Sequence, residues 1–417
     1  MKEEKEMEVL VTDGDQRSTL AVVRALGRAG IGVTVGETGA SSLAGSSRYC
    51  ARQVRYPSPS TDGDRFLAAL AGELAGGRYR ILLPMTDVTT RLVARRPELG
   101  TFAIVPFPGE EKIEWSQDKR RVLLLARRLG IRCPETWMLD EEDRIEEVSG
   151  QVRYPVVIKP RFSRYEQNGE WAAGEVEFAR DAEDLRQKYR ASQARLPFPM
   201  VQERIAGEGL GVFLLLWNGE LKAAFCHRRL REKPPWGGPS VYRESIAFDE
   251  ELVAKSACLL QAIGWQGPAM VEFKVDSRDG LPKLMEINGR FWGSLQLAID
   301  AGMNFPLLLF RLATGEDVPS QFDYAVGIRS RWLLGDLDHL LIRLMHRSGN
   351  GSGSNGLEKN GMSRLRACGE FLKFYEPGTR YEVFRWEDRG PGWQECRSYI
   401  RDLKRAARRG KETDGAN

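Results

Sequence analysis

The first hundred residues alternate between short apolar runs and segments with helical spacing. The runs MEVLVT, IGVTVG and YRILLP, which begin at residues 7, 31 and 79, have the pattern of buried strands, as do residues 102–105. TLAVVRALGRAG has helical spacing and ends at Gly30. Strands that alternate with helices predict a parallel, doubly wound sheet over roughly residues 7–110. The turn after the first run has a single glycine, so it lacks the G-x-G-x-x-G signature of a dinucleotide site.

The middle of the chain mixes further strands and helices. Ser116 to Gly130 has helical spacing, with Ser116 as its expected N-cap and Gly130 as its stop. YPVVIKP predicts a buried strand that ends at Lys159, and we expect a loop over residues 161–174. A strand at 200–205 and a hairpin that turns at Asn218-Gly219 are predicted next.

Residues 269–294 (AMVEFKVDSRDGLPKLMEINGRFWGS) predict a second hairpin, each arm of which is apolar on one face and polar on the other. The polar face carries Glu272 and Lys274 on the first arm and Glu286, Asn288 and Arg290 on the second. If the turn is symmetric about Asp279, Glu272 and Glu286 face each other with side chains about 5 Å apart.

Two facing carboxylates destabilise a hairpin unless a cation separates them. Carboxylate and amide oxygens are the ligands that Mg²⁺ prefers. The pattern therefore favours a divalent cation at Glu272, Glu286 and Asn288. A solvated charged face is the alternative.

Composition fits a globular enzyme of two to three domains. The chain has 417 residues, of which 42% are hydrophobic and 29% charged. The start MKEEKEMEVL is no signal peptide, and no apolar run approaches the roughly 20 residues of a membrane span. Six scattered cysteines without a C-x-x-C pair argue against a zinc site and fit a reducing compartment. We expect a cytoplasmic protein without a membrane partner.

The formal net charge of +4 originates near the C-terminus, where residues 401–411 form a basic run. We interpret this run as the solvated end of a helix, so no nucleic-acid partner is expected. Residues 347–361 are rich in glycine and serine and predict a flexible linker. Their G-x-G-x-x-G match at Gly351, Gly353 and Gly356 follows no apolar strand, so we treat it as a chance match.

The hairpin motif also resembles a known family. E-x-K followed by LMEINGRFWGS is similar to the metal and phosphate strands of ATP-grasp enzymes, in particular the carboxylate–amine ligase and carbamoyl-phosphate-synthase-like group. The resemblance implies an α/β fold with four parts. They are a Rossmann-like domain (1–115), a small lid subdomain (116–200), a large subdomain with the metal site (201–320) and a C-terminal extension (321–417) that contains the flexible 347–361 loop.

The resemblance also implies roles for individual residues. Lys119 and Lys159 match the lysines that contact nucleotide phosphates. Glu203, Arg204 and Ile205 match the hinge beside adenine, and Glu208 matches the group that binds the ribose. Glu272, Glu286 and Asn288 match the ligands of Mg²⁺ (or Mn²⁺), while Arg290 and Lys159 match the groups that assist phosphoryl transfer.

Two regions have a less direct correspondence with the family. His227, Arg228, Arg229, Gly237 and Gly238 are candidates for binding an anionic substrate, and a plain surface loop is the equal alternative. The family's lid loop is often glycine-rich, whereas here it has only Gly169 and Gly174. Arg161, Ser163 and Arg164 could take over the phosphate contacts of that loop.

The implied activity is an ATP-dependent ligase that activates a small-molecule carboxylate as an acyl phosphate and joins it to an amine. Its cofactors would be ATP and Mg²⁺, and a homodimer is compatible with the sequence. The alternatives are a bicarbonate-activating carboxylase or carbamoyl-phosphate-type synthetase, and an inactive nucleotide-binding protein. Substrate determinants are expected in the N-terminal domain and in the loops at 161–175 and 231–245.

Overall fold

The N-terminal part of the chain is built on a parallel four-stranded sheet. The computed structural model describes residues 7–140, 144–196, 198–345, 364–374 and 376–414. The sheet has the order β3-β2-β1-β4, from β1 (Met7–Val11), β2 (Gly32–Glu37), β3 (Arg52–Arg55) and β4 (Ile81–Leu83). This arrangement confirms the predicted doubly wound α/β fold. Residues 102–105 differ from the prediction, since they contribute a single parallel bridge from Ile104 to Ile81.

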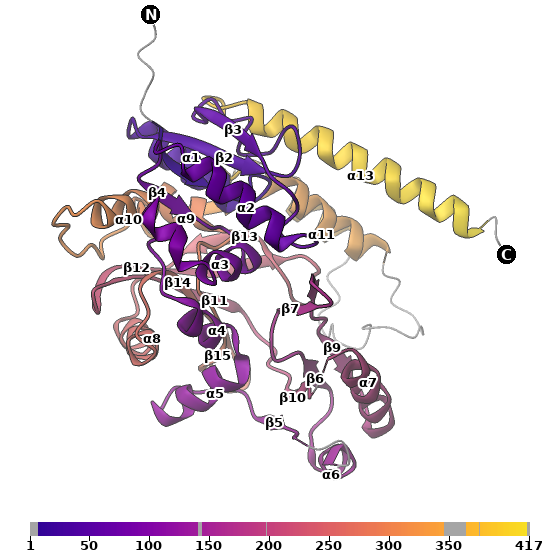
Figure 1. Cartoon of the computed structure of the whole chain (residues 1–417). Helices are drawn as coiled ribbons and strands as arrows, with labels where there is room; N and C mark the ends of the chain where they lie inside the picture. Colours follow the sequence, from indigo (N-terminus) through magenta and orange to yellow (C-terminus); the bar gives the residue numbers. More distant parts are fainter. Residues whose placement is uncertain (1–6, 141–143, 197, 346–363, 375, 415–417) are drawn as a thin grey trace, which may run out of the picture.

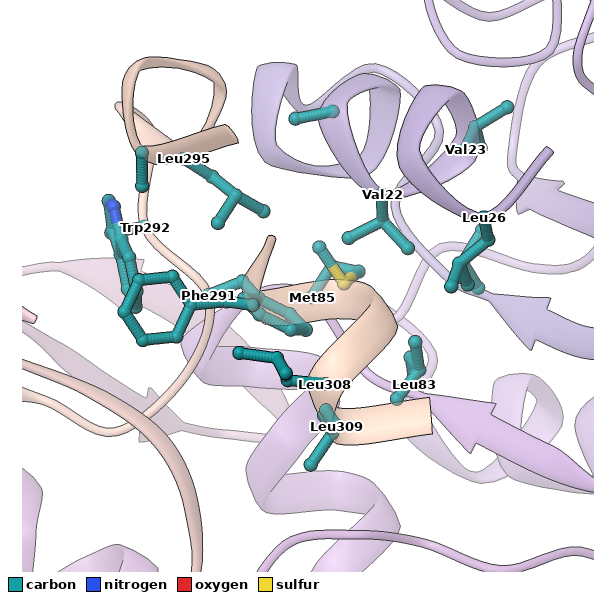
Figure 2. Packing of buried hydrophobic residues seen from close by; sticks show 14 of the residues in the cluster. Val22, Val23, Leu26, Leu83, Met85, Phe291, Trp292, Leu295, Leu308 and Leu309 are labelled. Atoms are coloured by element: carbon teal, nitrogen blue, oxygen red, sulfur yellow. The ribbon is translucent and has the colours of Figure 1, made fainter. Parts of the chain in front are cut away.

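Helices cover both faces of this sheet because its strands are apolar on both sides. Helix α1 (Arg17–Arg28) packs on the face of Val9 and Val11, whereas α2 (Gly63–Leu74) and α3 (Asp87–Ala94) pack on the face of Leu10. The α1 side is also where the rest of the molecule joins. Val22 and Leu26 of α1 lie in one core with Phe291 and with Leu309 of α10 (Phe305–Ala313) (Figure 2).

The predicted helix from Ser116 to Gly130 is instead two helices, α4 (Glu110–Gln117) and α5 (Lys119–Arg128). Asp118 separates them, because its carboxylate accepts hydrogen bonds from the backbone N–H groups of Arg120 and Arg121 and caps α5. Ser116, the expected cap, lies inside α4 and donates to the carbonyl of Ile113. The break makes Lys119 the first residue of α5.

A small antiparallel sheet follows, with the order β5-β10-β6-β9. Its strands are β5 (Thr136–Met138), β6 (Val156–Lys159), β9 (Glu177–Ala179) and β10 (Met200–Glu203). Its helices α6 (Arg144–Gln151) and α7 (Ala182–Arg195) lie at the end of the molecule opposite to the N-terminal sheet (Figure 1).

The loop predicted at 161–174 is largely a hairpin of β7 (Arg164–Gln167) and β8 (Glu170–Ala173). Asn168 and Gly169 both have positive φ, at 54° and 81°. Such a pair forms the two-residue turn whose twist suits a hairpin.

A seven-stranded sheet carries the hairpin on which the function prediction rests. Its order is β15-β14-β11-β12-β13-β16-β17. The strands are β11 (Gly209–Trp217), β12 (Glu220–Glu232), β13 (Ser240–Ser245), β14 (Gly267–Val275), β15 (Pro282–Asn288), β16 (Arg329–Arg331) and β17 (Thr379–Tyr381). The remaining helices are α8 (Glu250–Ala262), α9 (Leu295–Asp300), α11 (Leu333–Met345), α12 (Arg364–Phe371) and α13 (Gly390–Asp414).

The C-terminal residues join the large sheet to the N-terminal domain. Strands β16 and β17 extend the sheet at the edge of β13. Beyond β17, Asp388 accepts a hydrogen bond from Arg24 of α1 at 2.8 Å, and both side chains are only 1% exposed. Glu382 pairs with Arg17 and with Arg243 of β13. The four domain boundaries and the flexibility of 347–361 remain predictions, and that loop lies outside the described residues.

None of the helices in the described part of the chain is long and apolar enough to cross a membrane.

Candidate active site

The polar face of the β14–β15 hairpin has the predicted pairing. Glu272 is directly opposite Glu286, and Met270 is opposite Asn288. A register shift after Glu272 places Phe273 opposite Leu284, so the pairing is less regular than a symmetric turn would give. The prediction that the two carboxylates face each other is confirmed.

Each of the two carboxylates has its own basic neighbour. Arg229 of β12 donates through Nη2 to Glu272 Oε2 at 2.5 Å. Lys119 Nζ lies 3.5 Å from Glu286 Oε2. In this structure the repulsion between the two acids is therefore offset by cations that come from separate elements, one for each acid.

The pKa values of the two carboxyl groups shift in opposite directions. Burial raises the pKa of Glu272, and the nearby Arg229 only partly offsets that effect. Burial would also raise the pKa of Glu286, but Lys119 and Lys159 outweigh it and hold that pKa below its ordinary value. The Glu286 carboxyl is therefore held as a carboxylate, the form that binds a cation.

Lys159 lies at the end of β6 and faces the same carboxylates. Burial lowers the pKa of its ammonium group, while Glu286 acts in the opposite direction. No described residue offers Lys159 Nζ a hydrogen bond or an ion pair. Its neighbour Lys119 donates to Ser163 Oγ at 2.5 Å. A partly buried ammonium group without a protein partner suits an anionic ligand.

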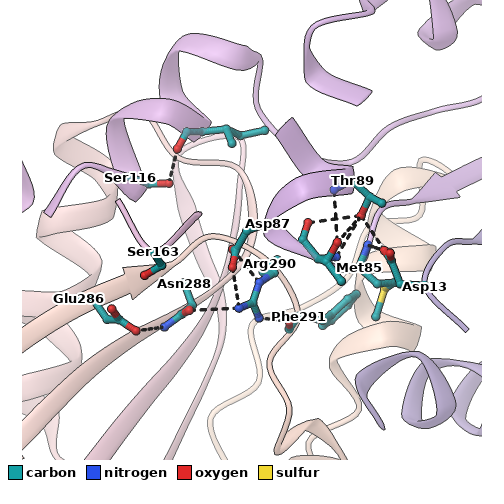
Figure 3. Close-up of polar contacts among 12 residues, drawn as sticks. Asp13, Met85, Asp87, Thr89, Ser116, Ser163, Glu286, Asn288, Arg290 and Phe291 are labelled. Carbon is teal, nitrogen blue, oxygen red and sulfur yellow. Dashed lines mark hydrogen bonds and ion pairs between the residues drawn. The ribbon is translucent and has the colours of Figure 1, made fainter. Parts of the chain in front are cut away.

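A chain of polar contacts leads from the hairpin to the N-terminal domain (Figure 3). Asn288 donates to Glu286 at 3.3 Å and accepts from Arg290 at 3.3 Å. Arg290 in turn donates through Nε and Nη2 to the two oxygens of Asp87, at 2.7 and 3.0 Å. Burial opposes the charge of Arg290, but Asp87 raises the pKa of the guanidinium above its ordinary value.

The donor set fits a hard divalent cation. Two facing carboxylates and the amide of Asn288 present oxygen ligands on one side of the hairpin. Among the described residues, no group of three His, Cys, Asp or Glu side chains is arranged to hold a metal, so this set consists of two carboxylates and one amide. Arg229 and Lys119 contact the same carboxylates that a metal would bind.

The predicted hinge lies where the small sheet meets the hairpin. Glu203 ends β10, and its carboxylate accepts hydrogen bonds from Arg278 and from Lys283 of β15. Burial would raise the pKa of Glu203, but these basic groups hold it below its ordinary value. The Glu203 side chain is thus committed to ion pairs, and any contact with adenine would have to come from the backbone. Burial lowers the pKa of the neighbouring Arg204, and Ile205 is buried.

Glu208 lies at the start of β11 and is half exposed. Its carboxylate is 4.0 Å from Arg228, and burial raises its pKa. Glu208 and Arg229 line a cavity of about 590 Å³ that α11 and α12 close on the other side.

The structure separates the residues proposed for substrate binding. Arg229 points to Glu272, whereas Arg228 lies on the other face of β12 and pairs with Glu244 at 2.7 Å. His227 is buried beside Phe213, and neither ring nitrogen has a hydrogen-bond partner among the described residues. Burial lowers the pKa of His227 far below its ordinary value, so the ring is neutral.

Gly237 and Gly238 lie in the β12–β13 loop and have φ angles of 140° and 154°. A side chain at residue 238 would collide with the backbone of Lys233, so the local turn alone requires this glycine.

Asp87 is a site residue that no sequence motif predicted. It directly follows the turn after β4, at the carboxyl end of a parallel strand, which is where α/β folds place ligand groups. That rule could have marked Asp87 as a candidate, but it does not say which residue Asp87 contacts.

Comparisons with known proteins identify the fold. A family model described as "ATP-grasp in the biosynthetic pathway with Ter operon" matches residues 195–334. An L-amino acid ligase from Bacillus licheniformis has a TM-score of 0.58 at 17% identity, over 75% of this chain and 76% of that one. No curated protein matches the chain in sequence.

Two further solved structures carry nucleotides. N5-carboxyaminoimidazole synthetase from Staphylococcus aureus, complexed with ADP, has a TM-score of 0.58 at 15% identity, over 78% of this chain and 80% of that one. The biotin carboxylase domain of Hydrogenobacter thermophilus 2-oxoglutarate carboxylase, with MgADP and bicarbonate, has a TM-score of 0.62 at 15% identity, over 78% and 73%. At such identities the likeness establishes the fold alone.

Proposed function

We propose that this chain, a member of the ATP-grasp superfamily, is an ATP-dependent ligase that activates a small-molecule carboxylate and joins it to an amine. The facing pair of Glu272 and Glu286, with Asn288 and Arg290 beside it, is the observation that carries the proposal. It provides anionic oxygens for a metal and a cation for a transferring phosphoryl group in one place.

The surrounding residues support a nucleotide site. Lys119 and Lys159 come from the α5 helix and the small sheet, and both lie near Glu286. The triphosphate would lie between the small sheet and the hairpin, where two ammonium groups neutralise it. We assign Glu203, Arg204 and Ile205 to the adenine side and Glu208 to the ribose.

Glu272, Glu286 and Asn288 are the residues that would hold Mg²⁺ or Mn²⁺. When bound, the metal would neutralise charge on the nucleotide phosphates. Arg229 and Lys119 would then share the two carboxylates with it.

The proposed reaction has two steps. A carboxylate oxygen of the substrate attacks the γ-phosphorus of ATP, the bond from phosphorus to ADP breaks, and an acyl phosphate forms. The amine then attacks the acyl carbon, the new C–N bond replaces the C–O bond to phosphate, and the amine's proton passes to solvent. The chain contributes positioning and charge neutralisation through Lys159 and Arg290, so no covalent nucleophile is required.

The test is ADP release with MgATP and a panel of amino acids and small acids, each offered with and without an amine. Glu286→Gln should lower substrate-dependent ADP release by two orders of magnitude or more, because it removes a charge at the reacting phosphates. Glu251→Gln, on the exposed side of α8, is the control. Full turnover by the folded Glu286→Gln variant would refute the metal assignment.

Bicarbonate activation is the second candidate. A biotin carboxylase domain, solved with bicarbonate, and a carboxyaminoimidazole synthetase have a similar fold. Bicarbonate in the same panel separates the candidates, since only a bicarbonate-activating enzyme would release ADP with it in preference to organic acids. Tight binding of a fluorescent ADP analogue without turnover of any substrate would instead favour an inactive nucleotide-binding protein.

A further inference from the structure

We propose that Asp87 of the N-terminal domain is a positioning residue that fixes Arg290 at the phosphoryl-transfer site. This inference rests on the proposed function, in which Arg290 contacts the transferring phosphoryl group. Asp87 belongs to neither the hairpin nor the sheet that carries it. Its carboxylate nevertheless accepts two hydrogen bonds from the guanidinium of Arg290 in an ion pair, and 21% of each side chain is exposed.

The contacts of Arg290 determine its orientation fully. Nε and Nη2 donate to Asp87, Nη1 donates to the carbonyl of Phe291 at 3.0 Å, and Nη2 also contacts Asn288. Because the guanidinium is planar, two parallel bonds to one carboxylate fix both its plane and its direction. Without Asp87, the side chain would keep only the weaker contacts of its own hairpin.

The backbone that carries Asp87 is itself rigid. Asp87 is the first residue of α3, behind the N-cap Thr86, whose hydroxyl accepts from the backbone N–H of Thr89 at 3.3 Å. Thr89 donates to the buried Asp13 after β1 at 2.6 Å. Val88 and Leu92 anchor the helix in the core of the N-terminal domain. Asp87 can therefore act as a fixed support for a side chain that reaches it from another domain.

Helix α3 and the residue after it also contact the β7–β8 hairpin, which lies where the family often has a glycine-rich lid loop. Arg91 and Arg95 place their guanidinium groups 5.6 and 5.5 Å from the ring centre of Trp171. Arg95 also pairs with Glu166 of β7 at 2.8 Å. Helix α3 thus contacts the lid hairpin through one end and Arg290 through the other, which sets the distance between them.

An ion pair that only joins two domains would look similar, so the test must separate positioning from stability. Asp87→Asn keeps the shape but loses the charge, and Asp87→Glu keeps the charge with a longer side chain. Glu110→Gln removes another partner of α3, the ion pair of Glu110 with Arg95 at 3.0 Å, without touching Arg290, and is the matched control.

In the ADP-release assay we expect Asp87→Asn to lower kcat about 10- to 100-fold, the effect of a misplaced catalytic group. The KM for MgATP should stay within twofold of wild type, and Asp87→Glu should recover part of the lost kcat. Glu110→Gln should keep the wild-type kcat. An unchanged kcat in Asp87→Asn would overturn the proposal, as would a loss that Asp87→Glu does not recover and that accompanies a large fall in Tm.

A readout without turnover keeps the two proposals distinguishable. Hydrogen exchange of residues 286–294, measured on the full chain with MgADP, should be faster in Asp87→Asn than in wild type, Asp87→Glu and Glu110→Gln. If the wild type turns over no substrate, the proposed function fails while the exchange experiment still decides whether Asp87 holds Arg290. Equal exchange in all four proteins would overturn the positioning role.

Discussion

At the scale of single residues, Glu395 of α13 shows how burial shifts the pKa of a carboxyl group. Burial raises its pKa to about 7, although the indole N–H of Trp332 donates to it at 2.7 Å. Its other oxygen is buried without a hydrogen-bond partner among the described residues. The folded protein therefore prefers the protonated acid, whereas the unfolded chain ionises with the ordinary pKa near 4.5.

This shift gives a pH dependence of stability with a definite sign. Because the folded pKa is raised, the unfolded chain ionises first, and stability falls as the pH rises from about 4.5 to about 7. Glu395→Gln, which cannot ionise, should have the same stability as wild type near pH 4.5 and be more stable at pH 8. The difference at pH 8 should be at most about 3.4 kcal/mol. Urea unfolding at both pH values measures it, and an equal difference at both would contradict the assignment.

Residue-scale prediction from the sequence succeeded where partners are close in the chain. Glu272 and Glu286 could be paired from strand alternation and one turn, and the structure has that pairing. The partners of these groups could not be found in the same way. Arg229 is 43 residues from Glu272, and Asp87 is 203 residues from Arg290. Such contacts follow from how the domains pack, which a local pattern does not contain.

At the scale of elements, the β7–β8 hairpin contacts the N-terminal domain through the ion pair of Glu166 with Arg95 and through the side chain of Trp171. Trp171 lies in the hydrophobic core of that domain, and its backbone N–H donates to the carbonyl of Ser60 at 2.8 Å. Arg91 of α3 and Arg95, which directly follows that helix, add cation–π contacts. The position of the β7–β8 hairpin in this structure therefore depends on an aromatic anchor and not on a glycine-rich loop.

Trp171→Ala should release this hairpin while leaving the rest of the fold in place. Each cation–π contact is worth about 0.5–1 kcal/mol, and the buried ring adds more, so residues 161–174 should exchange amide hydrogens at least tenfold faster. Tyr165→Ala changes the next cross-strand pair, on the opposite face of the hairpin, and is the control. Unchanged exchange at 161–174 in Trp171→Ala would show that Trp171 is no anchor.

Element boundaries were the weaker part of the sequence prediction. A continuous helical pattern hid the break at Asp118, because a capping carboxylate and a helix-interior one look alike in the sequence. Residues 161–174, predicted as a loop, contain Asn168-Gly169, a pair that favours a hairpin turn, and the structure has that hairpin. In both cases the structure follows residues that favour a cap or a turn, Asp118 and Asn168-Gly169, and the pattern of apolar positions does not indicate it.

At the scale of the whole molecule, a buried ionic cluster joins the first and last thirds of the chain. Arg24 donates to Asp388 and to the carbonyls of Glu382 and Val383, and Ser47 also donates to Asp388. Arg243 pairs with Glu382, and both are fully buried. The sequence pattern indicates no role for this C-terminal segment, since Asp388 is 364 residues from Arg24 and Glu382 is 139 residues from Arg243.

Asp388→Ala should therefore destabilise the protein strongly. It would leave the buried Arg24 without its counter-ion, and breaking a buried pair in this way costs about 3–5 kcal/mol. The neighbouring Glu387→Ala removes an ion pair with Arg28 whose side chains are 36% and 46% exposed, so its effect should stay below about 1 kcal/mol. Urea unfolding of both variants checks the contrast, and equal stabilities would contradict the role of Asp388.

The cluster also bears on how the protein is made. During synthesis Asp388, the counter-ion of Arg24, follows that arginine by 364 residues. Until then the guanidinium has no carboxylate to neutralise it in the position that the finished fold requires, so α1 must keep it hydrated. Helix α1 also packs against α10 and contributes Arg17 to the pair with Glu382. The contacts of α1 with this cluster can thus form only after the chain through Asp388 has left the ribosome.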